Sequence, residues 1–183
     1  MIRAKGDLFS PESYGYESVN AICITTNGTV KSNGHAVMGK GLALQATQRW
    51  PSISKTLGSK ITIQGHKVLV ISPWIDLENS YAVVSFPTKP ASAICSANKD
   101  NIMEKMRYAF KPGDLVPGYH CMATRAILAR SCDELLKLTE DSGWLRVALP
   151  VPAIGQGGMD RREVMSLLGE KWDKDDRFII VEQ

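Results

Sequence analysis

Several stretches of the chain are continuously apolar rather than alternating between apolar and polar residues. The runs of this kind that could form strands are 21–25, 60–63, 67–71, 81–86, 145–150 and 178–183. A strand with one solvated face alternates, so a continuous apolar run indicates a strand that is covered on both faces. The sequence therefore predicts a sheet buried between two layers.

Helical patterns lie between and beside these runs. Apolar residues recur at helical spacing over 102–110, 128–136 and 164–168. The first pattern follows "SANKD", whose polar residues suit helix caps, and Asp160 is placed to cap the third. A short helix from Gly41 to Arg49 must stop before the next proline. Alternating strands and helices predict a three-layer α/β/α domain, with ligands bound in loops after the strands.

The length and composition place this domain in a broad class. A chain of 183 residues with 44% hydrophobic content can form one well-buried domain, which we predict to span 1–183. The apolar runs are far shorter than the roughly 20 residues that cross a bilayer, and "MIRAKGDLF" lacks the apolar core of a secretory signal. We therefore expect a cytoplasmic, monomeric protein without a membrane partner. The net charge of +3 is scattered and is only weak support for an anionic partner.

The cysteines give no sign of a metal or disulfide framework. No two of the four cysteines stand in C-x-x-C spacing, so reduced thiols are expected at Cys23, Cys95, Cys121 and Cys132. His120 stands beside Cys121, but no second ligand pair accompanies them. We therefore predict no metal site and a structural role for both residues.

The loop after the 21–25 run contains "GHAVMGKG" at 34–41, which nearly matches the phosphate-binding pattern G-x-x-x-x-G-K-[ST]. Gly41 stands where that pattern needs a hydroxyl for magnesium, and eight residues separate Thr25 from Gly34. No apolar strand ends in an aspartate that could serve as its acidic partner. These differences argue against a nucleoside-triphosphatase.

The end of the same stretch nevertheless favours an anion. Gly39 and Gly41 would let a ligand approach the backbone closely, at a helix N-terminus with unpaired N–H groups. Lys40 is unfavourable at that position unless an anion lies nearby. The alternative is a glycine-rich turn with a surface lysine.

A second glycine loop, "GQGG", follows the 145–150 run and leads into another helical pattern. Gly155, Gly157 and Gly158 alone would more often mark a turn. Together with "MGKG", they could hold one diphosphate between two loops.

Lys89 follows the 81–86 run and is flanked by Pro87 and Pro90, which stiffen its loop. It could be a solvated surface lysine. It could instead point into the cleft of the glycine loops, where burial would lower its pKa and make it a nucleophile or electrostatic catalyst. The residue pattern leaves both open.

Taken in order, "KGDLF", "AICITTN", "MGKGLALQ", "RWP", "FPTK", "LPVPAIGQGG" and "DDRFIIVEQ" give a resemblance to the macrodomains, the ADP-ribose-binding fold. The resemblance covers essentially the whole chain. It is greatest to the branch that contains terminal ADP-ribose glycohydrolases and the antitoxins that remove ADP-ribose from DNA. It implies a three-layer α/β/α fold with a central mixed sheet of about six strands.

The resemblance also implies roles for particular residues. Asp7, with Leu8 adjacent, would recognise the adenine amino group, and Asn27 would lie near the distal ribose. Lys89 would be catalytic at the anomeric carbon, with no metal or redox cofactor. The residues that would hold the diphosphate and distal ribose are Met38, Gly39, Lys40, Gly41, Leu42, Ile154, Gly155, Gln156, Gly157 and Gly158.

The chain departs from the family pattern in three places. The loop before "MGKG" is longer and contains Lys31, Asn33 and His35. The second glycine loop is shorter, so Asp160 aligns better with a helix cap than with a catalytic acid. The stretch "PASAICSANKD" lacks the aromatic and basic residues expected for a DNA substrate.

Three functions follow from these observations. The first is hydrolysis of ADP-ribosyl linkages on protein or nucleic acid, favoured by Lys89. The second is a non-catalytic reader of ADP-ribose or ADP-ribosylated macromolecules. The third is an ADP-ribose 1″-phosphate phosphatase, which only His35 suggests.

Overall fold

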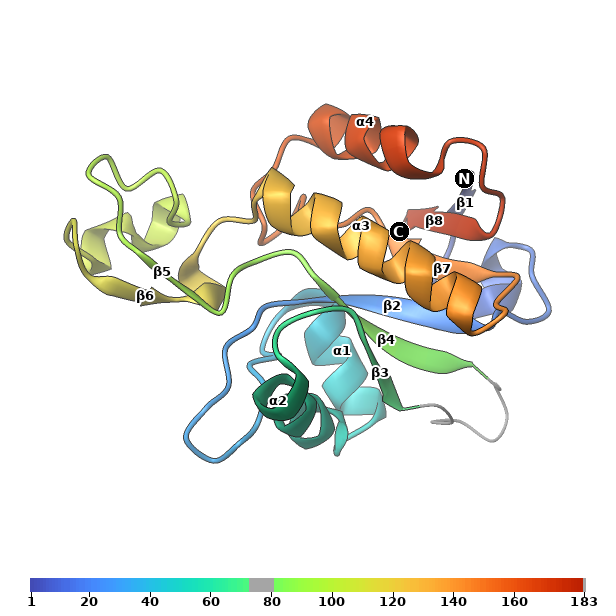
Figure 1. Ribbon diagram of the computed structural model, residues 1–183, viewed down its shortest axis with the longest axis horizontal. Coiled ribbons are helices and arrows are strands. Elements are labelled where there is room, and N and C mark those ends of the chain that lie inside the picture. Colours follow the sequence, from blue (N-terminus) through green and yellow to red (C-terminus); the bar gives the residue numbers. More distant parts are fainter. Residues whose placement is uncertain (73–80, 183) are drawn as a thin grey trace.

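The centre of the protein is a six-stranded sheet, seen in a computed structural model that describes residues 1–72 and 81–182. The sheet order is β1-β8-β7-β2-β4-β3, and only β3 runs antiparallel to its neighbour (Figure 1). Its strands are β1 (Ile2–Lys5), β2 (Ala21–Thr26), β3 (Leu69–Ser72), β4 (Ala82–Pro87), β7 (Val147–Pro150) and β8 (Phe178–Glu182). The predicted mixed sheet is confirmed. Gln183, the last residue of the predicted 178–183 strand, lies outside the described residues.

Helices cover both faces of the sheet, as Figure 1 shows. Helices α1 (Gly41–Arg49) and α2 (Ile53–Gln64) pack on one face, and α3 (Arg125–Asp141) and α4 (Arg161–Trp172) on the other. Along β2, Ile22 belongs to the first hydrophobic cluster and Cys23 to the second. Both faces of the strand are therefore buried, and the predicted three-layer α/β/α architecture is confirmed.

The predicted strand at 60–63 is wrong, because these residues form the last turns of α2. Ile53, Leu57 and Ile61 recur every four residues and are buried, which is the stripe of an amphipathic helix. Ile63 is 82% exposed on the opposite side. A short apolar run does not by itself separate a strand from a buried helical segment.

The sheet still has six strands because it includes β1, which the apolar pattern did not predict. Its sequence, "IRAK", alternates between half-buried and exposed residues. It lies at the edge of the sheet and pairs only with β8. Short, charged strands are typical of sheet edges because they discourage pairing with other chains.

The predicted helix over 102–110 is also wrong. These residues belong to a lobe, residues 91–123, that projects from one end of the sheet (Figure 1). Met103, at φ −54 and ψ 131, lies outside the helical region, and only a 3₁₀ helix, η2 (Glu104–Ala109), follows. Ile102, Met106 and Phe110 instead belong to a small hydrophobic cluster within the lobe, and Ile102 forms an antiparallel bridge with Cys121. The remaining elements are η1 (Pro11–Tyr14), β5 (Ser92–Ile94), β6 (Leu115–Pro117) and η3 (Gly118–His120).

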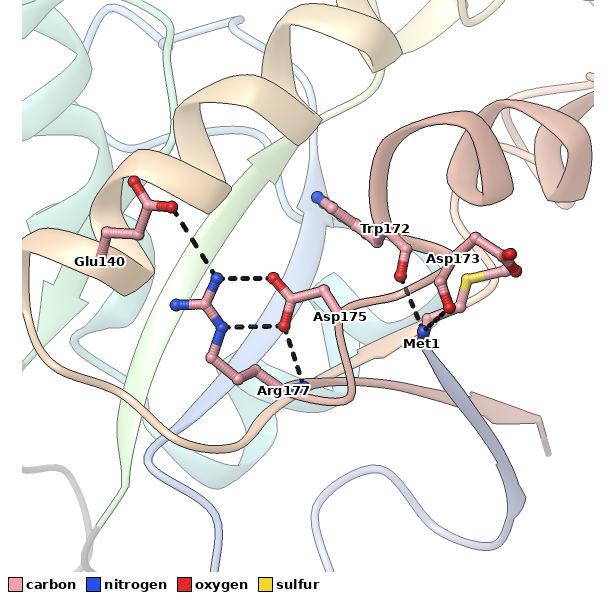
Figure 2. Close-up of polar contacts among 6 residues, drawn as sticks. All are labelled: Met1, Glu140, Trp172, Asp173, Asp175 and Arg177. Atoms are coloured by element: carbon pink, nitrogen blue, oxygen red, sulfur yellow. Dashed lines mark hydrogen bonds and ion pairs between the residues drawn. The ribbon is translucent and has the colours of Figure 1, made fainter.

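Polar contacts fix the segment between α4 and β8 (Figure 2). The Arg177 guanidinium donates two hydrogen bonds to the Asp175 carboxylate, at 2.8 and 2.6 Å. The Met1 ammonium donates to the carbonyl oxygens of Trp172 and Asp173, at 2.7 and 3.0 Å. A positive group at these carbonyls is favourable because they carry the negative end of the α4 dipole.

The four cysteines are buried and free. Within the two described ranges, no helix is long and apolar enough to span a bilayer.

Candidate functional site

A cleft of about 580 Å³ opens where four parallel strands end. Thr26 at the end of β2, Pro150 at the end of β7 and Glu182 at the end of β8 line it, together with Thr88 just after β4. The carboxyl ends of strands are where sheets of this class bind ligands. The volume is in the range of small-molecule sites.

The first glycine loop leads into α1 at one part of this cleft. Lys40 is the N-cap of α1, and no side chain caps the helix. Gly41, Leu42 and Ala43 at the start of α1 line the cleft. Gly41 has φ 57, a left-handed conformation that favours glycine. The unpaired N–H groups and the positive dipole end of α1 therefore lie at the cleft, as an anion site requires.

The second glycine loop lines the same cleft with residues 154–157. Within the described residues, the backbone N–H groups of these four residues donate to no other protein group. The loop is closed on itself by Met159, whose N–H donates to the Ala153 carbonyl at 3.1 Å. Ala153 has φ 64, an unusual conformation for a residue with a side chain. The loop thus offers several free donors from a braced backbone.

Three lysines line the cleft: Lys40, Lys89 and Lys105. The Lys105 ammonium donates to the Gln156 side-chain oxygen at 2.8 Å, which joins the lobe to the second glycine loop. Among the described residues, the only carboxylate that lines the cleft is that of Glu182, and Arg161 pairs with it. The cleft therefore carries an excess of positive charge that favours an anionic ligand.

Lys89 is buried in the wall of this cleft, with 6% of its surface exposed. Its ammonium donates to the Met103 sulfur at 3.0 Å and to the Tyr119 carbonyl at 3.4 Å. None of the described carboxylates pairs with it. The alternative of a solvated surface lysine is therefore wrong.

Burial is the main cause that lowers the pKa of Lys89, to about 8. The positive charges of Lys105 and Lys40 lower it further, while Cys121 opposes the shift. A lysine with this pKa is partly a neutral amine near pH 8, and the neutral amine is the nucleophilic form.

Comparisons with known proteins bear on the fold. No protein-family model matches the chain, and no curated protein matches it. Among solved structures, the macrodomain of Mycobacterium tuberculosis DarG superposes with a TM-score of 0.67 at 18% identity, over 98% of this chain and 96% of that one. The macrodomain of Thermus aquaticus DarG gives 0.63 at 18% identity, over 100% and 97%. The protein has the macrodomain fold.

A third similar structure is a complex with ADP-ribose. Thermosipho africanus DarTG in complex with ADP-ribose superposes with a TM-score of 0.65 at 14% identity. The match covers 100% of this chain and 42% of the DarTG chain.

Most of the predicted site residues meet in this cleft. Those in its wall are Asn27, Met38, Gly39, Lys40, Gly41, Leu42, Lys89, Ile154, Gly155, Gln156 and Gly157. The Asn27 amide also braces the first glycine loop, donating to the Val37 carbonyl at 3.0 Å and accepting from the Thr29 N–H at 3.0 Å. Gly158 lines a smaller adjoining groove of about 370 Å³.

Asp7 and Leu8 are not among the residues that line the cleft. Leu8 is fully buried in the core. The Asp7 carboxylate accepts the N–H of Phe9 at 3.0 Å. Asp7 follows Gly6, whose N–H donates to the carbonyl of the cleft residue Glu182. The structure thus places Asp7 beside the β8 end of the cleft rather than in its wall.

Two other residues considered from the sequence have roles outside the cleft. The His35 imidazole lies 3.0 Å from the Ser54 hydroxyl on α2 and does not line the cleft. The Asp160 carboxylate accepts the N–H groups of Arg162 and Glu163, at 2.8 and 3.2 Å. Asp160 is therefore the predicted cap of α4.

The sequence interpretation missed Lys105, Tyr119 and Arg161 as cleft residues. His120, for which a structural role was expected, also lines the cleft. Lys105, Tyr119 and His120 belong to the lobe, and no local sequence pattern predicts that the lobe packs against the cleft. Their proximity to Lys89 depends on how the lobe packs.

Proposed function

We propose that this macrodomain binds ADP-ribose and hydrolyses ADP-ribosyl linkages, with Lys89 acting at the distal ribose. The observation that carries the proposal is a buried lysine without a carboxylate partner, in a cleft with two glycine loops and two further lysines. The similarity to DarTG in complex with ADP-ribose supports this choice of ligand.

The diphosphate would be held by the two glycine loops. The α1 N-terminus and residues 154–157 both present unused N–H donors at the cleft. Such donors bind phosphate oxygens without a metal ion. Lys40 and Lys105 add positive charge on the same cleft wall.

The distal ribose would then lie against Lys89. Its neutral amine forms a bond to the anomeric carbon as the bond from that carbon to the acceptor breaks, and the electron pair leaves with the acceptor. Water next replaces the amine, which releases ADP-ribose and restores Lys89. The acceptor would be a side chain of a protein or a nucleotide of a nucleic acid.

The test combines calorimetric titration of ADP-ribose with release assays on ADP-ribosylated protein and DNA. Lys89→Ala should keep ADP-ribose binding and lower the release rate at least about a hundredfold, because it removes the nucleophile. Lys55→Ala, an exposed lysine of α2, is the matched control and should match the wild type.

Each outcome has a defined meaning. Absence of ADP-ribose binding by the wild type would contradict the whole proposal. Binding without release from either substrate would leave a reader of ADP-ribose. Unchanged release in Lys89→Ala would assign catalysis to another group.

The pH dependence gives a second check. Burial lowers the pKa of Lys89 to about 8, so the neutral amine is lost as the pH falls below that value. The release rate should therefore rise with pH up to about 8 and then level off. A rate that is constant from pH 6 to 9 would exclude attack by Lys89.

A further inference from the structure

Hydrolysis by Lys89 needs a group that takes a proton from the attacking water, and neither Asp160 nor Glu182 is available for this. Asp160 caps α4 through bonds to two backbone N–H groups. Glu182 pairs with Arg161. Among the described residues, Glu182 is the only carboxylate that lines the cleft, and Asp160 does not line it.

Among the residues that the structure describes, His120 is the only imidazole in the cleft wall. It ends η3, and its carbonyl accepts the Met103 N–H at 3.0 Å, which fixes the turn. Its ring lies 4.2 Å from that of Tyr119 and 5.7 Å from that of Phe110, measured between centroids. Within the described residues, neither ring nitrogen makes a hydrogen bond. The imidazole is therefore held in place by packing, while its nitrogens stay free.

The same turn positions Lys89. The Tyr119 carbonyl accepts the Lys89 ammonium at 3.4 Å, and His120 is the next residue. Both side chains line one cleft. A water molecule that attacks a sugar held by Lys89 would therefore lie within the part of the cleft that His120 borders.

We propose that His120 is the general base that activates water in the second step of the hydrolysis; this rests on the function proposed above. The water oxygen forms a bond to the anomeric carbon, and the bond from that carbon to Lys89 breaks, with its electron pair returning to the lysine nitrogen. The water proton passes to a ring nitrogen of His120, which then releases it to solvent. The products are ADP-ribose, the free acceptor and the unchanged enzyme.

The charges around His120 agree with this role. Burial lowers the pKa of His120, and the positive charges of Lys89, Lys40 and Lys105 lower it further. These three lysines come from the segment after β4, the first glycine loop and η2. This shift favours the neutral imidazole, which is the form that can accept a proton.

The test uses His120→Gln, which keeps a polar side chain but removes the base. We expect ADP-ribose affinity within about twofold of wild type and release slowed about a hundredfold. Samples quenched with denaturant at neutral pH, because acid would cleave an N-glycosyl bond, should show by mass spectrometry ADP-ribose accumulating on Lys89, since the first step still occurs. His35→Gln, outside the cleft, is the control and should release at the wild-type rate.

A second variant separates chemistry from structure. His120→Ala should regain release activity when imidazole is added, since free imidazole can replace the missing base. Unchanged release and pH profile in His120→Gln would overturn the proposal. So would loss of ADP-ribose binding in both variants, or failure of imidazole to restore release. If the wild type releases nothing from any substrate, the proposed function itself fails, and this role fails with it.

Discussion

Both glycine loops line the cleft, but a side chain would meet different surroundings in each. A Cβ atom added to Gly39 would have no atom within 4 Å, whereas one added to Gly157 would lie 2.2 Å from the Ala153 carbonyl oxygen. The first loop therefore leaves open space beside its backbone. The second loop is packed against itself, and its glycine allows the chain to fold back.

This difference separates two reasons for a glycine-rich sequence. At Gly39 the missing side chain leaves room for a ligand, and at Gly157 it leaves room for the protein's own backbone. Substitutions in the two loops should thus divide between effects on binding and effects on stability.

Gly157→Ala should be the most damaging of these substitutions. The new methyl group would clash with a backbone oxygen, which cannot move without opening the loop. We expect the free energy of unfolding to fall by about 3 kcal/mol, as for overpacked sites. Denaturant unfolding measures this loss. Gly155→Ala, where a Cβ meets nothing within 4 Å, is the control, and an equal loss there would refute the explanation.

Gly41→Ala should have an intermediate effect. Gly41 has φ 57, and for a residue with a side chain this conformation lowers the free energy of unfolding by roughly 1–2 kcal/mol. Space is not the cause, because a Cβ would meet nothing within 4 Å. Gly41→Asn should recover part of the loss, since asparagine tolerates the left-handed region better. Equal stability of the alanine and asparagine variants would show that the backbone conformation is not limiting.

Asp160→Ala tests the anchor of the second loop on α4. The variant loses the two hydrogen bonds that Asp160 accepts from backbone N–H groups at the start of α4. The free energy of unfolding should therefore fall by about 1 kcal/mol, measured by thermal or denaturant unfolding. Asp160→Asn, which can still cap, should stay near wild type. The release rate should change little in either variant. A loss of release without a loss of stability would instead make Asp160 a catalytic acid.

The layered sheet could be predicted from the sequence because its signal is local. Continuous apolar runs such as 21–25 and 145–150 indicate burial on both faces, and β2 and β7 lie there. The 60–63 run misled because four apolar residues fit a helix equally well, and the deciding residue, Ile53, lies outside the run. The charged edge strand β1 had no apolar signal.

The candidate site was only partly predictable for a related reason. Residues that follow strands, such as Asn27 and Lys89, lie in the cleft because the fold class brings strand ends together. The burial of Lys89 depends on Met103 and Tyr119, which come from the lobe. Lys105 and His120 reach the cleft through the packing of that lobe, which no spacing in the sequence predicts.

Gly39→Ala should change stability least and therefore gives the clearest view of the ligand. The methyl group enters open space, so the free energy of unfolding should stay within about 0.5 kcal/mol of wild type. If ADP-ribose approaches the backbone here, calorimetry should show about tenfold weaker binding, or about 1.4 kcal/mol. Gly169→Ala, in α4 and outside the cleft, where a Cβ also meets nothing within 4 Å, should leave affinity unchanged. Wild-type affinity in Gly39→Ala would mean that the first loop holds the ligand through the α1 N-terminus and Lys40 alone, and the contrast between the two loops would then concern folding rather than binding.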